Sequence, residues 1–201
     1  MSWIKEISFA QATGTLKKLY KRVKGPNDNI DNILMAHSLR PHTLQGHMSL
    51  YKNVLHHKDN QLPKWYLETL GVYVSMLNHC DYCIDHHFAG LQRLVGEEEA
   101  GRLRAGLDQA DIPQDLLQPS YVLGLAYARQ LTQLSDPMNA GQIDVLRESG
   151  LDDGQILEIN QVVSYFNYAN RTVIGLGVPT DSDNLGLSPN DNADESNWQH
   201  T

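Results

Sequence analysis

Apolar side chains recur at intervals of three and four residues along most of this 201-residue chain. That spacing places them on one face of an α-helix. Strand signals are nearly absent, because the chain has no sustained alternation of polar and apolar residues and no Asn-Gly hairpin turn. The sequence therefore predicts an all-α fold, organised as a compact helical bundle.

Prolines, glycines and capping residues divide this pattern into separate helices. Thr13 and Asp152 are the expected N-caps of the first and last helix, and Gly96 is an expected stop. Segment 63–78 is apolar around most of its circumference, which is typical of a buried helix. We expect helices over residues 13–23, 31–39, 41–55, 63–78, 80–95, 97–107, 120–134, 139–148 and 152–174.

The composition changes after residue 179. Residues 1–179 contain all the expected helices and predict a single all-helical domain. Residues 180–201 contain five acidic residues and no Lys or Arg, so this tail cannot bury a core of its own. We expect it to be disordered, or to dock on a neighbouring subunit through Leu185, Leu187 or Trp198.

Charge and hydropathy argue against several classes of protein. The chain has 24 acidic and 16 basic residues, a formal charge of −8, whereas nucleic-acid binders usually carry a basic face. No apolar run approaches the roughly 20 residues that span a bilayer. Residues 1–25 contain scattered charges and not the apolar segment of a secretory signal. We expect a cytoplasmic protein with neither a nucleic-acid nor a membrane partner.

The most informative feature is the pair Cys80 and Cys83, the only cysteines in the chain. On the first turn of a helix, their Cα atoms lie about 5 Å apart, within the range of a disulfide. A helix N-terminus also favours the reactive thiolate. His87, one turn further, can accept the thiol proton, and Glu68 can reach His87 if the two helices fold back on each other. The pattern predicts a carboxylate–imidazole–thiol relay.

The same residues also allow roles other than the relay. The two cysteines are alternatively small buried hydrophobes or zinc ligands. One Cys-x-x-Cys followed by histidines on the same helix makes a poor tetrahedral ligand set for zinc. We therefore expect neither a metal nor a cofactor. Glu68 is alternatively a surface charge, and His87 a solvated or core histidine. Tyr82 and His86 are auxiliary candidates: Tyr82 either packs or donates a proton, and His86 is interpreted as a bystander.

Two further polar groups are given structural roles. His37, His42 and His47 follow each other at five-residue steps, which scatter around a helix, so we interpret them as ordinary histidines. Polar residues within the last apolar helix are expected to bridge to another helix or subunit and not to be catalytic; these are Asn167, Asn170 and Arg171.

The spacing Glu68-x11-Cys80-x-x-Cys83-x3-His87 resembles the signature of the alkylhydroperoxidase D-like/carboxymuconolactone decarboxylase superfamily. Flanking segments are similar to its peroxidase-related branch: HSLRP at 37–41, VSMLNHCDYCIDHH at 74–87 and YFNYANR at 165–171. The resemblance implies an all-helical fold that forms dimers, trimers or hexamers. It also implies that Cys83 attacks the peroxide, that Cys80 resolves the sulfenic acid as a disulfide, and that Glu68 with His87 relays the proton.

The chain departs from that pattern at Tyr82, where the best-known alkylhydroperoxidase D has a histidine. Lyase members of the superfamily lack the cysteine pair, so decarboxylation fits poorly. We expect a thiol-dependent hydroperoxidase that acts on a hydroperoxide and is reduced by an external dithiol. The alternatives are a protein disulfide reductase or redox adaptor, and a non-catalytic, redox-sensing helical oligomer. A homo-oligomer is also expected because apolar faces that include Trp3, Phe9 and Trp65 need cover.

Overall fold

The computed structural model describes residues 2–109, 112, 116–189 and 197–200. The prediction of an all-α fold is confirmed for this part of the chain, whose only extended pairing is an isolated bridge between Pro189 and His200. The helices are α1 (Gly14–Val23), the 3-10 turn η1 (Pro26–Asp28), α2 (Asn32–Ala36), α3 (Pro41–Leu55), α4 (Lys64–Leu77), α5 (Asp81–Val95), α6 (Glu97–Leu107), α7 (Pro119–Gln133), α8 (Ala140–Glu148) and α9 (Asp153–Leu176).

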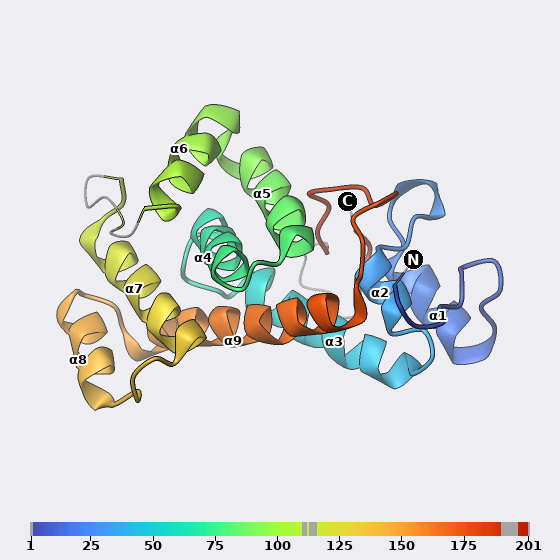
Figure 1. The fold of residues 1–201 in the computed structure, drawn as a ribbon, viewed down its shortest axis with the longest axis horizontal. Helices are drawn as coiled ribbons and strands as arrows, with labels where there is room; N and C mark the ends of the chain where they lie inside the picture. The colour runs from blue at the N-terminus through green and yellow to red at the C-terminus, as the bar shows by residue number, and fades with distance from the viewer. Residues whose placement is uncertain (1, 110–111, 113–115, 190–196, 201) are drawn as a thin grey trace.

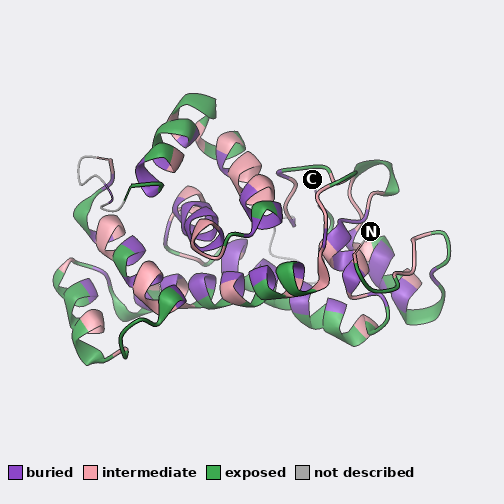
Figure 2. Cartoon of the chain, viewed as in Figure 1, coloured by how far each residue is buried: buried purple, intermediate pink, exposed green. Residues whose placement is uncertain are grey.

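Helix α4 is the centre of the bundle. Figure 1 shows it viewed nearly end-on, enclosed by α5, α6, α7 and α9. Every residue from Tyr66 to Ser75 is buried, as expected for a segment that is apolar nearly all round (Figure 2). The approach to α9 is close, because a Cβ atom on Gly71 would lie 2.2 Å from the ring of Phe166.

The helix ends agree with the sequence in most places. Asp152 caps α9 by accepting a hydrogen bond from the backbone N–H of Gln155. Gly96 ends α5 with a φ of 87°, a left-handed conformation that favours glycine. The expectation for Thr13 was wrong in one respect: it occupies the N-cap of α1, but its side chain makes no capping hydrogen bond. None of the described helices is long and apolar enough to cross a membrane.

The chain returns after α9 and lies over α2 and α5 (Figure 1). The Asn32 side-chain amide donates to the carbonyl oxygens of Pro179 and Asp181, both at 2.9 Å. Trp198 is buried within its own chain, with the Arg22 guanidinium 3.8 Å from its ring centre. The expectation of disorder or partner docking for 180–201 stays a prediction as a whole, because residues 190–196 and 201 lie outside the described residues.

Candidate functional site

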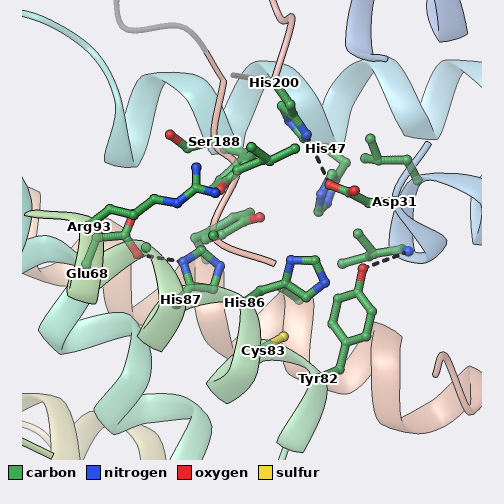
Figure 3. A pocket seen from close by; sticks show the side chains of 18 of the residues that line it. Asp31, His47, Glu68, Tyr82, Cys83, His86, His87, Arg93, Ser188 and His200 are labelled. Carbon is green, nitrogen blue, oxygen red and sulfur yellow. Dashed lines mark hydrogen bonds and ion pairs between the residues drawn. The ribbon is translucent and has the colours of Figure 1, made fainter. Parts of the chain in front are cut away.

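A cavity of about 120 Å³ lies where α3, α4, α5 and α9 meet the returning C-terminal segment. One face of α5 lines it from end to end, through residues at helical spacing: Cys83, His86, His87, Gly90, Arg93 and Leu94. The C-terminal segment adds Gly186, Leu187, Ser188 and His200. Figure 3 shows the Cys83 sulfur near His86 and His87, with Arg93 and Ser188 on the far side. The segment expected to be a disordered or docking tail therefore supplies part of the cavity wall.

The predicted carboxylate–imidazole pair is present. Helices α4 and α5 fold back on each other at His79, whose φ of 55° permits the tight turn. This brings His87 Nδ1 to 2.7 Å from Glu68 Oε2, and only 3% of Glu68 is exposed. Because a carboxylate only accepts, the Nδ1–H donates, which leaves Nε2 of the ring on the cavity side. Glu68 is thus a partnered buried acid and not a surface charge.

The two cysteines are free thiols at different depths around the cavity. Cys83 lines the cavity, whereas Cys80 packs behind it against Val173 and Val178. Cys80 is 1% exposed and Cys83 is 3% exposed. A small oxidant in the cavity therefore meets Cys83 first.

The two thiols differ in pKa. A hydrogen bond from the Cys83 thiol lowers the pKa of Cys80, and the Cys83 backbone N–H and Asn170 lower it further. The hydrogen bond to Cys80, together with burial, raises the pKa of Cys83 well above its usual value. Cys80 occupies the N-cap of α5, where unpaired N–H groups favour an anion. In the reduced pair Cys80 thus loses its proton first, with Cys83 as the donor.

His87 lies beside the thiols without being bonded to them. Within the described part of the chain, no hydrogen bond joins its ring to either sulfur. Its ring instead packs edge-on against Phe166 at 4.6 Å and Tyr51 at 6.0 Å between ring centres. The expected continuous relay from thiol to imidazole to carboxylate is therefore not preformed. Only its imidazole–carboxylate half is assembled.

Asn170 is a site residue that the sequence did not identify. Its side chain bridges α9 to α4, as expected, by donating to Ser75 Oγ at 3.0 Å and accepting from Asn78 at 2.9 Å. It also hydrogen-bonds both cysteines and lowers the pKa of each. No sequence spacing connects position 170 with the Cys-x-x-Cys segment, so only the packing of α9 on α4 reveals this role.

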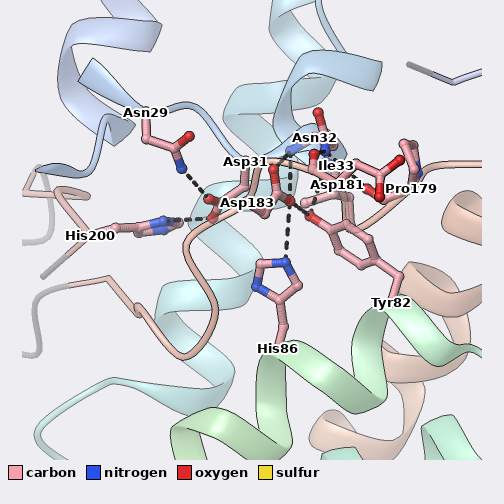
Figure 4. Close-up of polar contacts among 10 residues, drawn as sticks. All are labelled: Asn29, Asp31, Asn32, Ile33, Tyr82, His86, Pro179, Asp181, Asp183 and His200. Atoms are coloured by element: carbon pink, nitrogen blue, oxygen red, sulfur yellow. Dashed lines mark hydrogen bonds and ion pairs between the residues drawn. The ribbon is translucent and has the colours of Figure 1, made fainter. Parts of the chain in front are cut away.

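Tyr82 and His86 face the C-terminal segment. The Tyr82 hydroxyl donates to Asp183 Oδ2 at 2.6 Å and accepts from the Ile33 N–H at 3.2 Å (Figure 4). His86 Nε2 lies 3.2 Å from the same carboxylate oxygen, and its ring stacks on Tyr82 at 4.5 Å. Burial raises the pKa of Tyr82 well above its usual value. The hydroxyl hydrogen is thus directed to Asp183 and away from the thiols.

Two further histidines border the cavity. His200 Nδ1 lies 3.0 Å from Asp31 Oδ2, in a pair that is almost fully buried. Burial lowers the pKa of His47 to about 3, so its ring is neutral. The His37 and His47 rings lie 5.1 Å apart, because His37 is in the turn after α2 and not on the helix that carries His47. His47 therefore lines the cavity, and its interpretation as an ordinary histidine stays a prediction.

The described residues contain no cluster of three or more His, Cys, Asp or Glu side chains arranged to hold a metal ion.

No protein-family model matches the sequence, and no curated protein matches it. Solved structures do. A peroxidase-related alkylhydroperoxidase D core from Ralstonia eutropha JMP134 has a TM-score of 0.72 at 21% identity, covering 90% of this chain and 93% of its own.

Two other structures share the fold. An uncharacterized peroxidase-related protein from Silicibacter sp. TM1040 has a TM-score of 0.65 at 24% identity, over 75% of this chain and 76% of its own. A variant of the debrominase Bmp8 in complex with 2,3,4-tribromopyrrole has a TM-score of 0.65 at 12% identity, over 90% and 91%. The chain therefore has the fold of the alkylhydroperoxidase D core and of peroxidase-related proteins, as its sequence resemblance implied.

Proposed function

We propose that this chain, with its alkylhydroperoxidase D fold, reduces hydroperoxides through Cys83 and Cys80. The placement of Cys83 is the observation that carries the proposal. It lines the cavity that also contains the Glu68–His87 pair, and the second thiol lies in hydrogen-bond contact behind it. A nucleophile, a resolving thiol and a proton donor are thus within reach of one small molecule.

The first step uses the hydrogen bond between the sulfurs. The Cys80 thiolate accepts the thiol proton of Cys83 as the Cys83 sulfur attacks one peroxide oxygen. The O–O bond breaks, and the leaving alkoxide takes a proton from the His87 imidazolium. The products are an alcohol, a sulfenic acid on Cys83, a thiol on Cys80 and a neutral His87.

The second step forms the disulfide. The Cys80 sulfur attacks the Cys83 sulfenic acid, an S–S bond forms, and water leaves. An external dithiol then reduces the disulfide by thiol exchange and supplies the two electrons that the peroxide consumed. Cys83 reacts with peroxide in this scheme because of its position on the cavity, although Cys80 has the lower pKa.

The buried carboxylate gives His87 its role. Glu68 fixes the orientation of the His87 ring through the hydrogen bond at Nδ1, so that the opposite nitrogen of the protonated ring can donate to the alkoxide. The absence of a hydrogen bond between His87 and either thiol in the described structure fits a proton donor to the leaving group better than a base for the thiol. Tyr82 has no proton-donating part in this cycle, since its hydroxyl is bonded to Asp183.

Burial of both sulfurs favours a small oxidant over a protein disulfide, because a protein could not reach them without displacing the C-terminal segment.

A halogenated aromatic compound is the second candidate substrate. The stacked rings of Tyr51 and Tyr165, 5.5 Å apart on the cavity wall, favour a flat molecule there. A peroxidase assay with a dithiol reductant, repeated with a bromopyrrole in place of the peroxide, separates the two substrates. A homo-oligomer and a cytoplasmic location stay predictions.

The test is a peroxidase assay with a dithiol reductant, combined with the intact mass after one equivalent of peroxide. We expect the wild type to lose two hydrogens, mapped to a Cys80–Cys83 disulfide. Cys80→Ser should stop at a sulfenic acid that a dione reagent traps, and Cys83→Ser should not react. Full turnover by both serine variants would refute the proposal.

A further inference from the structure

We propose that the cavity selects hydroperoxides that carry a carboxylate, and that Arg93 binds this group. The proposal rests on the proposed function for the reacting end of the ligand. The anionic end follows from the cavity itself, so the two can fail separately.

Helix α5 places a positive charge at a fixed distance from the thiol. Cys83 and Arg93 are ten residues apart on the face that lines the cavity, which corresponds to about 15 Å of helical rise. Helical side chains lean toward the N-terminus, so the guanidinium is closer to the sulfur than this rise. Figure 3 shows the Arg93 side chain reaching over His87 toward Ser188.

The charges of the cavity wall leave Arg93 without compensation. The acids on the wall are already partnered, since Asp31 pairs with His200 and Glu68 with His87. Arg93 is exposed at the edge of the cavity and forms no ion pair or hydrogen bond with the other described residues. A carboxylate is the ligand group that a guanidinium binds best, through two parallel hydrogen bonds.

The cavity wall between the thiol and the guanidinium is partly apolar. Gly90 has no side chain where it passes the Glu68 carboxylate, and Leu94 and Leu187 border the opening. Deeper in the cavity wall, His47 Nδ1 and His200 Nε2 are buried and have no hydrogen-bond partner among the described residues. Buried ring nitrogens usually have one, so a polar group of the ligand is expected there. The cavity thus offers a path for a molecule that places a peroxide at Cys83 and an acid at Arg93.

Two alkylating reagents test the anionic end without requiring turnover. Iodoacetate and iodoacetamide form the same kind of thioether and differ in charge, and peptide mapping restricts the rate to Cys83. Arg93→Met is expected to lower the ratio of the iodoacetate rate to the iodoacetamide rate by about fivefold, and Arg93→Lys should retain most of it. Arg102→Met, on the exposed surface of α6, makes the same change in net charge and should leave the ratio unchanged.

Turnover tests the substrate class. The wild type should use an ω-carboxyalkyl hydroperoxide with a higher kcat/KM than its methyl ester, and Arg93→Met should abolish the preference mainly through KM. An unchanged alkylation ratio and an unchanged preference in Arg93→Met would overturn this proposal and leave the peroxidase intact. An Arg93-dependent ratio in a protein that reduces no peroxide would uphold anion binding and refute the peroxidase.

Discussion

His87 donates a hydrogen bond of 2.7 Å to the buried carboxylate of Glu68, across the interface of α4 and α5. Glu68→Gln keeps the shape of the side chain but removes the carboxylate that orients His87. We expect kcat/KM for peroxide to fall by about 100-fold, since the proton donor to the alkoxide is lost. Stopped-flow measurement of sulfenic acid formation checks this, with exposed Glu98→Gln as the charge-matched control. A rate that depends on Glu98 as strongly as on Glu68 would contradict the assignment.

The hydrogen bond between the sulfurs predicts the pH dependence of alkylation. Contact with Cys80 is the largest cause of the raised pKa of Cys83, ahead of burial. Cys80→Ala removes that contact, so the midpoint of Cys83 alkylation by iodoacetamide should move to lower pH. Burial still acts on Cys83, and it keeps the midpoint from falling as far as that of an exposed thiol. An upward or absent shift would show that the pair is not coupled in this sense.

The buried histidines predict loss of stability in acid. Burial lowers the pKa of His47 to about 3 in the folded state, so below about pH 6.5 the unfolded chain binds more protons. The stability from neutral His47 is therefore complete above pH 6.5 and is lost as the pH falls toward 3. The slope is up to about 1.4 kcal/mol per pH unit for this residue. Urea unfolding at several pH values should give a shallower slope for His47→Gln than for the wild type. Exposed His42→Gln should not change it.

Asp183 is expected to hold the C-terminal segment over the cavity. Its nearly buried carboxylate accepts hydrogen bonds from Tyr82 and from the Asn32 backbone and pairs with His86. Asp183→Ala removes these contacts and should weaken docking by about 2 kcal/mol. Hydrogen exchange in 180–189 and the alkylation rate of Cys83 should both increase. Asp181→Ala is the matched control, because only the backbone carbonyl of Asp181 contacts Asn32. Equal effects of the two variants would remove Asp183 from this role.

Two glycines should respond to alanine in opposite directions. At Gly71 the new methyl group would lie 2.2 Å from Phe166, so Gly71→Ala forces α4 and α9 apart. We expect a loss of about 1–3 kcal/mol in the free energy of unfolding.

At Gly46, within α3, the new Cβ meets nothing within 4 Å, and helix propensity should make Gly46→Ala stabilising by about 0.5–1 kcal/mol. Thermal and urea unfolding measure both, and a stable Gly71→Ala protein would contradict the packing.

The helices and the Glu68–His87 pair were predictable because they depend on local order. Apolar spacing defines each helix, and proline or glycine ends it. Glu68 and His87 are close because consecutive helices joined by a tight turn must lie side by side. The hairpin geometry therefore follows from the order of the two helices.

The rest of the site joins residues that no local pattern relates. Tyr82 and Asp183 are 101 positions apart, and Asp31 and His200 are 169 apart. Composition predicted a disordered or partner-docking tail, since residues 180–201 cannot form a core. The contacts of Asp183 arise because the rest of the protein offers hydrogen-bond donors to its carboxylate. The direction of the hydrogen bond between the thiols, which determines the more acidic sulfur, depends on side-chain orientation that spacing does not specify.

The position of Cys83 and Arg93 on one face of α5 also constrains how this site could be altered. Cys83 and Arg93 are carried by one helix, so the separation of their Cα atoms is fixed and remodelling the surrounding loops cannot lengthen it. Moving the arginine by one helical turn would change its separation from Cys83 by about 5.4 Å. Inserting a single residue between the two would rotate the arginine by about 100° away from the face that lines the cavity. Redesign for longer or shorter ligands must therefore proceed in whole helical turns.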